Sequence, residues 1–155
     1  MIPGLALRRR FSDLSEREIL ALAISAEEDD ARIYRTYAEH LRADYPASAQ
    51  VFEDMAAEED RHRQRLIAAH KRRFGDTIPL IRREHVAGFY ARRPVWLVET
   101  LGIERIREEA ERMEHEAHAF YLEAAQRTAD ADTRRLLGDL DLTARSVVDR
   151  PLNLF

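Results

Sequence analysis

The clearest chemical signal in the sequence is a glutamate and a histidine three residues apart, Glu59 and His62. On an α-helix this spacing places both side chains on one side, where they can bind one metal ion together. In steps of three and four residues they fall within an otherwise apolar stripe, which consists of Phe52, Met55, Glu59, His62 and Leu66. Burying a carboxylate and an imidazole there costs free energy unless they satisfy each other or bind a cation.

Two further glutamates interrupt apolar stripes in the same way. Glu27 lies among Leu20, Ile24, Ala31, Tyr34 and Ala38, and Glu114 lies among Ala110, Ala117, Tyr121 and Ala124. Each acid precedes a tyrosine by seven residues, so the two segments share a register and indicate two related helix pairs. Three inward acids and one inward histidine make a poor core and a good site for a divalent cation such as Fe(II) or Mn(II). Glu28, about 100° further round the helix, is a fallback ligand.

Four amphipathic segments are predicted to position these residues. A capping box at Ser15 and Glu18 begins a helix that runs to about Leu41, and Pro46 begins a second that spans roughly 46–74. A third covers about 103–128 and a fourth about 132–148, with a short helical turn expected at 95–101. The irregular stretch 76–96 is long for a plain turn and indicates a crossover between the second and third helices. We expect an all-α four-helix bundle, with a plain up-and-down bundle as the alternative.

The composition fits one such domain over residues 1–155. The chain is 45% hydrophobic and 35% charged, and five Gly and five Pro are too few for a many-turned β-fold. A net charge of -4 gives no general attraction to nucleic acid. Because cysteine is absent, thiolate chemistry and cysteine-ligated metals are excluded. No apolar run approaches the ~20 residues of a membrane span, so we expect a soluble, cytoplasmic protein.

The sequence resembles the rubrerythrin branch of the ferritin-like superfamily. The resemblance covers about 19–140 and rests on Ile24-Ser25-Ala26-Glu27 with Tyr34, Met55-Ala56-Ala57-Glu58-Glu59-Asp60-Arg61-His62, and Met113-Glu114-His115-Glu116-Ala117-His118-Ala119-Phe120-Tyr121. The segment 23–34 is most similar to the cytoplasmic domains of membrane-bound ferritins, in which a vacuolar-iron-transporter-like membrane domain follows. The resemblance implies a ferritin-like bundle with a di-iron or iron–manganese centre that handles Fe(II) with dioxygen or peroxide.

Position by position, the resemblance makes Glu27 and Glu114 terminal ligands, Glu59 the bridging acid and His62 the imidazole ligand. The fourth helix departs from the family pattern, which places a second Glu-x-x-His at 144 and 147, where this chain has Ala144 and Val147. We therefore expect an isolated monomer to bind one metal ion tightly and a second weakly. His118, Asp141 or a second subunit are the three alternative sources of the missing ligands.

Two functions follow from the resemblance. The first is a non-haem ferroxidase or peroxide-consuming oxidoreductase with a degraded second half-site. The alternative is a non-catalytic iron or manganese sensing or delivery domain, tethered in the full-length protein to a membrane iron transporter. Under either function we expect a homodimer. Tyr34 and Tyr121 are predicted to fill the core or to donate hydrogen bonds to the ligand carboxylates, and His40, His70 and His85 to lie on the surface.

Overall fold

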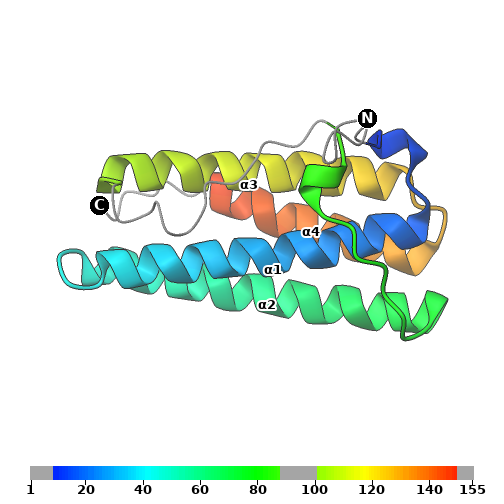
Figure 1. Ribbon diagram of the computed structural model, residues 1–155, viewed down its shortest axis with the longest axis horizontal. Coiled ribbons are helices and arrows are strands. Elements are labelled where there is room, and N and C mark those ends of the chain that lie inside the picture. The colour runs from blue at the N-terminus through cyan, green and yellow to red at the C-terminus, as the bar shows by residue number, and fades with distance from the viewer. Residues whose placement is uncertain (1–8, 88–100, 150–155) are drawn as a thin grey trace, which may run out of the picture.

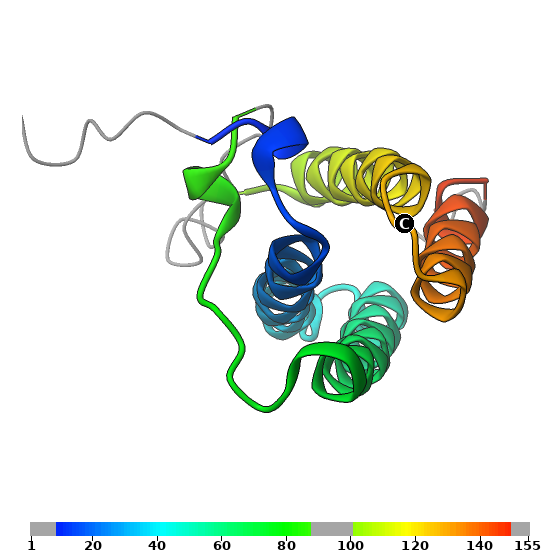
Figure 2. The same cartoon turned by 90° about the vertical axis from the view of Figure 1, so that its right-hand side faces the viewer.

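Four long helices make up the computed structural model, which describes residues 9–87 and 101–149, with side chains up to residue 142 in the second range. These are α1 (Glu16–Leu41), α2 (Pro46–Phe74), α3 (Ile103–Gln126) and α4 (Ala131–Asp149). A 3-10 turn, η1 (Phe11–Asp13), precedes α1, and a second, η2 (Arg83–His85), lies in the connection between α2 and α3. The helices lie side by side along the long axis of the molecule (Figure 1) and occupy the four corners of the bundle when viewed from its end (Figure 2). The predicted all-α four-helix bundle, with its long connection between α2 and α3, is confirmed. The helical turn predicted at 95–101 lies, but for Leu101, outside the described residues.

The helix ends follow from local chemistry. At the start of α1 the amide of Glu18 donates to the Ser15 hydroxyl at 3.2 Å, and the amide of Ser15 donates to the Glu18 carboxylate at 3.1 Å. This is the predicted capping box, which satisfies amides that have no partner within the helix. Pro46 opens α2, and Gly75 ends it with a φ of 88°, a left-handed conformation that glycine adopts without strain.

The apolar core is divided into two clusters along the bundle. One contains the first turns of α1 together with Leu66 of α2, the end of α3, and Leu137 and Leu140 of α4. The other contains the second half of α1, the first half of α2 and the start of α3, with Tyr34, Tyr37 and Phe52 at its centre. The candidate ligands lie in the layer between the two clusters. The bundle therefore places polar side chains at mid-height, with apolar packing above and below them.

The crossover that follows α2 is held against α1 by hydrogen bonds and ion pairs. Arg17 donates to the carbonyl oxygen of Thr77 at 2.6 Å, and the Ser25 hydroxyl donates to that of Ile81 at 2.5 Å. Further along, Nη2 of Arg83 lies 2.9 Å from Oδ1 of Asp30, and both side chains are buried. Figure 2 shows this segment, in green, passing along the outer side of α1. The connection is thus a fixed wall of the bundle over residues 75–87.

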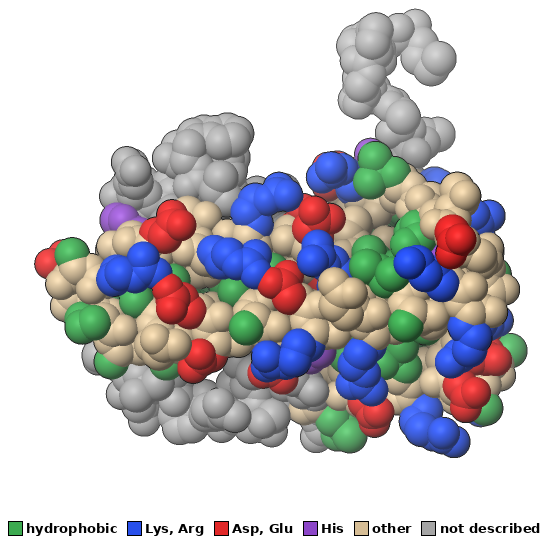
Figure 3. All heavy atoms as spheres, turned by 90° about the horizontal axis from the view of Figure 1, so that it is seen from below, with side chains coloured by type: hydrophobic (Ala, Val, Ile, Leu, Met, Phe, Trp, Pro, Cys, Tyr) green, Lys and Arg blue, Asp and Glu red, His purple; other side chains and the backbone are tan. Residues whose placement is uncertain are grey.

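Charged side chains of both signs cover the outer surface. On the face shown in Figure 3 the basic and acidic side chains are interspersed and do not gather into a patch of one sign. Many form ion pairs three or four residues apart on one helix, such as Arg107 with Glu111 at 3.5 Å. Exposed pairs of this kind contribute little, typically about 0–1 kcal/mol each, so the stability of the bundle depends on its core.

One prediction about the surface histidines is wrong. His70 was expected on the surface, but it is fully buried near the end of α2, where its Nδ1 lies 3.1 Å from the carbonyl oxygen of Gly75 and its ring packs on Phe74. The reason is its register, because position 70 continues the inward stripe of His62 and Leu66. His40 is half-buried and His85 is exposed.

The capping box gives a direct test of the first helix. We expect Ser15→Ala to lower the free energy of unfolding by about 1 kcal/mol, because one amide of the first turn loses its acceptor. Urea unfolding followed by circular dichroism measures this. Ser12→Ala, at an exposed position outside the box, is the matched control and should change stability much less. Equal effects of the two variants would contradict the assignment.

Candidate metal centre

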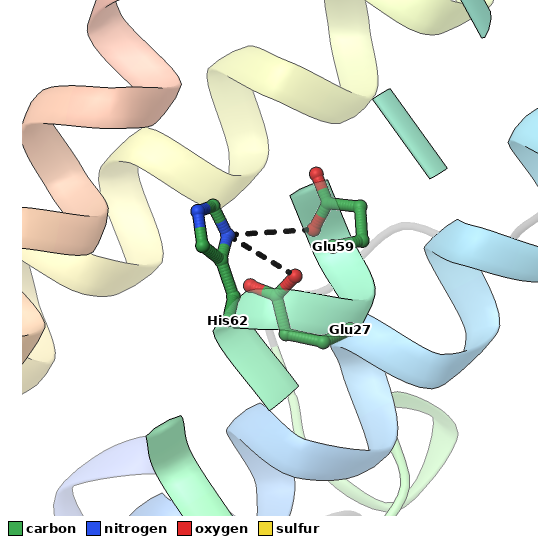
Figure 4. Close-up of side chains that lie close together, drawn as sticks. All are labelled: Glu27, Glu59 and His62. Atoms are coloured by element: carbon green, nitrogen blue, oxygen red, sulfur yellow. Dashed lines mark ion pairs between the residues drawn. The ribbon is translucent and has the colours of Figure 1, made fainter. Parts of the chain in front are cut away.

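Three predicted ligands meet in the middle layer of the bundle. Glu27 comes from α1, and Glu59 and His62 come from adjacent turns of α2 (Figure 4). Nδ1 of His62 lies 3.6 Å from Oε2 of Glu27 and 3.9 Å from Oε2 of Glu59. One ligand atom from each residue lies within 4.8 Å of the other two. Glu27 and His62 are almost fully buried, with exposed fractions of 4% and 7%.

The spacing of these atoms suits a metal ion better than direct contact. At 3.6 and 3.9 Å the pairs are too far apart for hydrogen bonds, and Oε2 of Glu27 and Nδ1 of His62 are buried without a hydrogen-bond partner. A buried polar atom in this state costs about 1–3 kcal/mol. Two ligand atoms that each lie ~2.1 Å from one metal ion are separated from each other by up to ~4 Å. The distances of 3.6 and 3.9 Å from Nδ1 of His62 to the two carboxylate oxygens fall within this limit. Two carboxylates and an imidazole therefore form a donor set that fits a borderline divalent ion such as Fe(II) or Mn(II).

The second nitrogen of His62 faces a different acid. Its Nε2 lies 3.8 Å from Oε1 of Glu58, a partly exposed side chain one turn earlier on α2. Nδ1 of the same ring is the nitrogen directed at Glu27 and Glu59. A metal ion bound between these acids would therefore use Nδ1 and leave Nε2 facing Glu58.

Two tyrosines connect α1 and α3 in a reciprocal pattern. The Tyr34 hydroxyl on α1 donates to Oε1 of Glu114 on α3 at 2.5 Å, and the Tyr121 hydroxyl on α3 donates to Oε1 of Glu27 on α1. The shared register of Glu27 with Tyr34 and of Glu114 with Tyr121 is therefore a symmetry of the structure. Both tyrosines are buried, so they fill the core and orient the carboxylates at the same time. Filling the core and donating hydrogen bonds to the carboxylates, the two roles predicted for these tyrosines, are therefore compatible.

Burial dominates the electrostatics of the two terminal acids. It raises the pKa of Glu27, against the opposing effect of His62. It also raises the pKa of Glu114 to about 8, with the charges of Asp30, Glu27 and Glu58 adding to the effect. Both acids therefore hold protons more strongly than exposed glutamates do. A cation bound beside them displaces protons, which couples metal affinity to pH.

The fallback ligands lie elsewhere. Glu28 is exposed and forms an ion pair with Arg32 at 3.8 Å. His118 on α3 and the buried Asp141 on α4 contact each other through Nδ1 and Oδ1. Among the described residues, only Glu27, Glu59 and His62 form a cluster of three ligand atoms. Glu114 stands beside this cluster with its carboxylate bonded to Tyr34.

Two buried polar pairs near the centre were not anticipated from the sequence. The Tyr37 hydroxyl donates to Oε2 of Glu109 at 3.1 Å, and Arg83 pairs with Asp30. For Glu109 a signal was present, since it lies three residues after Ile106 and four before Met113 and so belongs to an inward stripe. For Arg83 there was none, because its burial depends on where the crossover passes.

The comparisons with known proteins agree with this geometry. The family model for rubrerythrin matches residues 18–142, a range that includes every candidate ligand. The chain belongs to the rubrerythrin family. The fold is also that of a solved structure, a hypothetical protein from Pyrococcus furiosus, with a TM-score of 0.72, 24% sequence identity, and coverage of 89% of this chain and 86% of that one. No curated protein matches the sequence.

Membership of the rubrerythrin family makes the bundle ferritin-like and supports non-haem iron as the metal. The fourth helix of this chain lacks the second Glu-x-x-His that the family pattern places at positions 144 and 147. Positions 144 and 147 lie within α4, and alanine and valine offer no ligand atom there. The rubrerythrin fold is therefore present, with Glu27, Glu59 and His62 gathered in one cluster and no side chain able to bind a metal at positions 144 and 147.

The raised pKa of Glu114 predicts how the metal-free protein responds to pH. The pKa is about 8 in the folded state and 4.5 in a model compound, so the folded state binds the additional proton between these values. This contribution to stability is complete below pH ~4.5 and is lost as the pH rises toward 8. We expect Glu114→Gln to weaken the decline between pH 5 and pH 8 and to raise stability at pH 8.

Urea unfolding in the presence of a chelator measures the effect. Glu111→Gln, on the exposed side of the same helix, is the control and should leave the pH dependence as in the unmodified chain. An identical decline in the Glu114→Gln variant would contradict the assignment of the proton to Glu114.

Proposed function

We propose that this rubrerythrin-family chain binds iron at Glu27, Glu59 and His62 and acts as a ferroxidase or peroxide-consuming oxidoreductase. The observation that carries the proposal is the pair of buried, unpartnered ligand atoms, Oε2 of Glu27 and Nδ1 of His62, which face each other across 3.6 Å. A cation removes the free-energy cost of both atoms at once. Dioxygen or peroxide is the proposed small-molecule substrate.

Each protein group has a defined task under this proposal. Glu27 and Glu59 supply anionic oxygens, and His62 supplies the nitrogen Nδ1, with its other nitrogen facing Glu58. Tyr121 orients Glu27 and Tyr34 orients Glu114. Iron, when bound, supplies the one-electron redox chemistry that these side chains lack. Apolar clusters on either side limit the water around the site.

The incomplete second half-site supports an alternative function. Without a second Glu-x-x-His, a second ion would be held chiefly by Glu114, with Glu59 as the nearest further acid of the predicted ligand set. A site of this kind suits reversible binding, as in a sensing or delivery domain for a membrane iron transporter. No helix among the described residues is long and apolar enough to cross a bilayer. Tethering, a cytoplasmic location and the homodimer stay predictions.

Metal titration tests the ligand set. We expect anaerobic Fe(II) or Mn(II) titration of the metal-free monomer to give one tight and one weak binding event. His62→Leu should weaken the tight event by more than the ~10–100-fold typical of outer-shell substitutions. His115→Leu, at an exposed position on α3, is the control and should bind as the unmodified chain does. Two equally tight sites in a chain shown to be monomeric by ultracentrifugation would contradict the expectation.

Turnover separates the two functions. For the oxidoreductase we expect Fe(II) to be oxidised by dioxygen or peroxide faster than in a protein-free control, and Glu59→Gln to return the rate to near that control. Absorbance of the ferric product measures this. Glu53→Gln, two turns earlier on α2, is the control and should preserve the rate. Reversible Fe(II) binding without accelerated oxidation would instead support delivery or sensing.

A further inference from the structure

A small cavity adjoins the metal centre on the side of the crossover. It has a volume of about 20 Å³ and lies between α1, α3 and η2. This is enough for about one water molecule. Among the described residues, its lining includes Ala26, Glu27, Asp30, Arg83, Glu116 and Ala117. Glu27 belongs to both the cavity and the candidate ligand cluster, so the cavity leads directly to a ligand.

The cavity has a solvent side and a buried side. Ala26, Glu116 and Ala117 are partly exposed, whereas Glu27, Asp30 and Arg83 are buried. The two alanines come from facing helices and extend no further than Cβ. A larger side chain at either position would project into a space that holds only one water-sized particle. Small residues at the outer end therefore keep the passage open. Glu27 lies at the inner end, where its Oε1 accepts from Tyr121, another lining residue, and its Oε2 faces His62 beyond the cavity.

The charge of the lining favours a cation. Three carboxylates, those of Glu27, Asp30 and Glu116, share the cavity with one guanidinium, that of Arg83. The guanidinium is held by Asp30 at 2.9 Å and by Asp29 at 3.8 Å, so the crossover anchors it at one wall. An excess of acids in a space with apolar walls raises the local concentration of cations.

We propose that divalent metal ions reach the centre through this cavity, with Ala26 and Ala117 setting its width and Glu116 supplying attracting charge, since Asp30 is paired with Arg83. The inference depends on the proposed function, because it requires a metal ion at Glu27, Glu59 and His62. It adds a route and the residues that control the rate of exchange. The side chains of the route, apart from Glu27, hold no ion in the final site.

A narrowed passage must slow uptake and release together. We expect Ala117→Leu to reduce the rate of Co(II) uptake and the rate of Co(II) release by about tenfold each, equivalent to about 1.4 kcal/mol in each barrier. The dissociation constant should remain unchanged, because the three ligands are intact. Stopped-flow transfer of Co(II) to an excess of a coloured chelator gives the release rate, and equilibrium competition gives the dissociation constant.

Ala119→Leu provides the matched control, since residue 119 is exposed on the same helix and does not line the cavity. It should exchange metal as the unmodified chain does. If Ala117→Leu fails to fold, Ala26→Val tests the same passage from the facing helix. In addition, Glu116→Gln should slow uptake at low ionic strength more than at high ionic strength, because salt screens the lost attraction.

The outcomes separate the two proposals. The access route would be overturned if Ala117→Leu and Ala26→Val left the rates of Co(II) uptake and release unchanged. It would also be overturned if Ala119→Leu slowed exchange equally, or if a changed dissociation constant accounted for the altered rates. Absence of Co(II), Fe(II) and Mn(II) binding by the unmodified chain would overturn the proposed function itself.

Discussion

The structure depends on one electrostatic constraint, the burial of acids and an imidazole at mid-height of a helical bundle. Apolar clusters occupy both ends of the bundle, and the polar layer between them contributes little hydrophobic stabilisation. Such a layer persists only where its polar atoms find partners. Some find them within the protein, as Glu114 does with Tyr34. Oε2 of Glu27 and Nδ1 of His62 do not, and this difference sets the candidate metal centre apart from the contact between Glu114 and Tyr34.

The tyrosine pairs relate α1 to α3 by equivalent contacts. Tyr34 and Tyr121 make the same contact in opposite directions, so α1 and α3 contribute equivalent terminal acids. The equivalence does not extend to the other pair of helices, since α2 carries Glu59 and His62 whereas α4 carries Ala144 and Val147. His118 and Asp141 contact each other between α3 and α4 instead. Glu59 and His62 thus cluster with Glu27, whereas His118 and Asp141 pair with each other.

Much of the fold was predictable because its causes are local. The capping box at Ser15, Pro46 at the start of α2 and Gly75 at its end act over a few residues, and the helices begin and end within two residues of the expected positions. The candidate ligands were detectable for the same reason, since a charged residue in an apolar stripe stands out by spacing alone. His70 was misassigned although its register was inward, and Glu109 was overlooked although its own stripe was visible.

The sequence by itself determined which side chains face inward, because the helical repeat of 3.6 residues relates spacing directly to direction. It also determined that cysteine chemistry is absent and that the fourth helix lacks the expected ligands. Only the tertiary structure decided which inward groups meet. Glu27 reaches His62, Glu114 reaches Tyr34, and Arg83 of the crossover reaches Asp30, through contacts between residues 35 to 80 positions apart. Such contacts depend on how the helices are rotated and displaced against one another, which the packing of the whole core sets and no local pattern specifies.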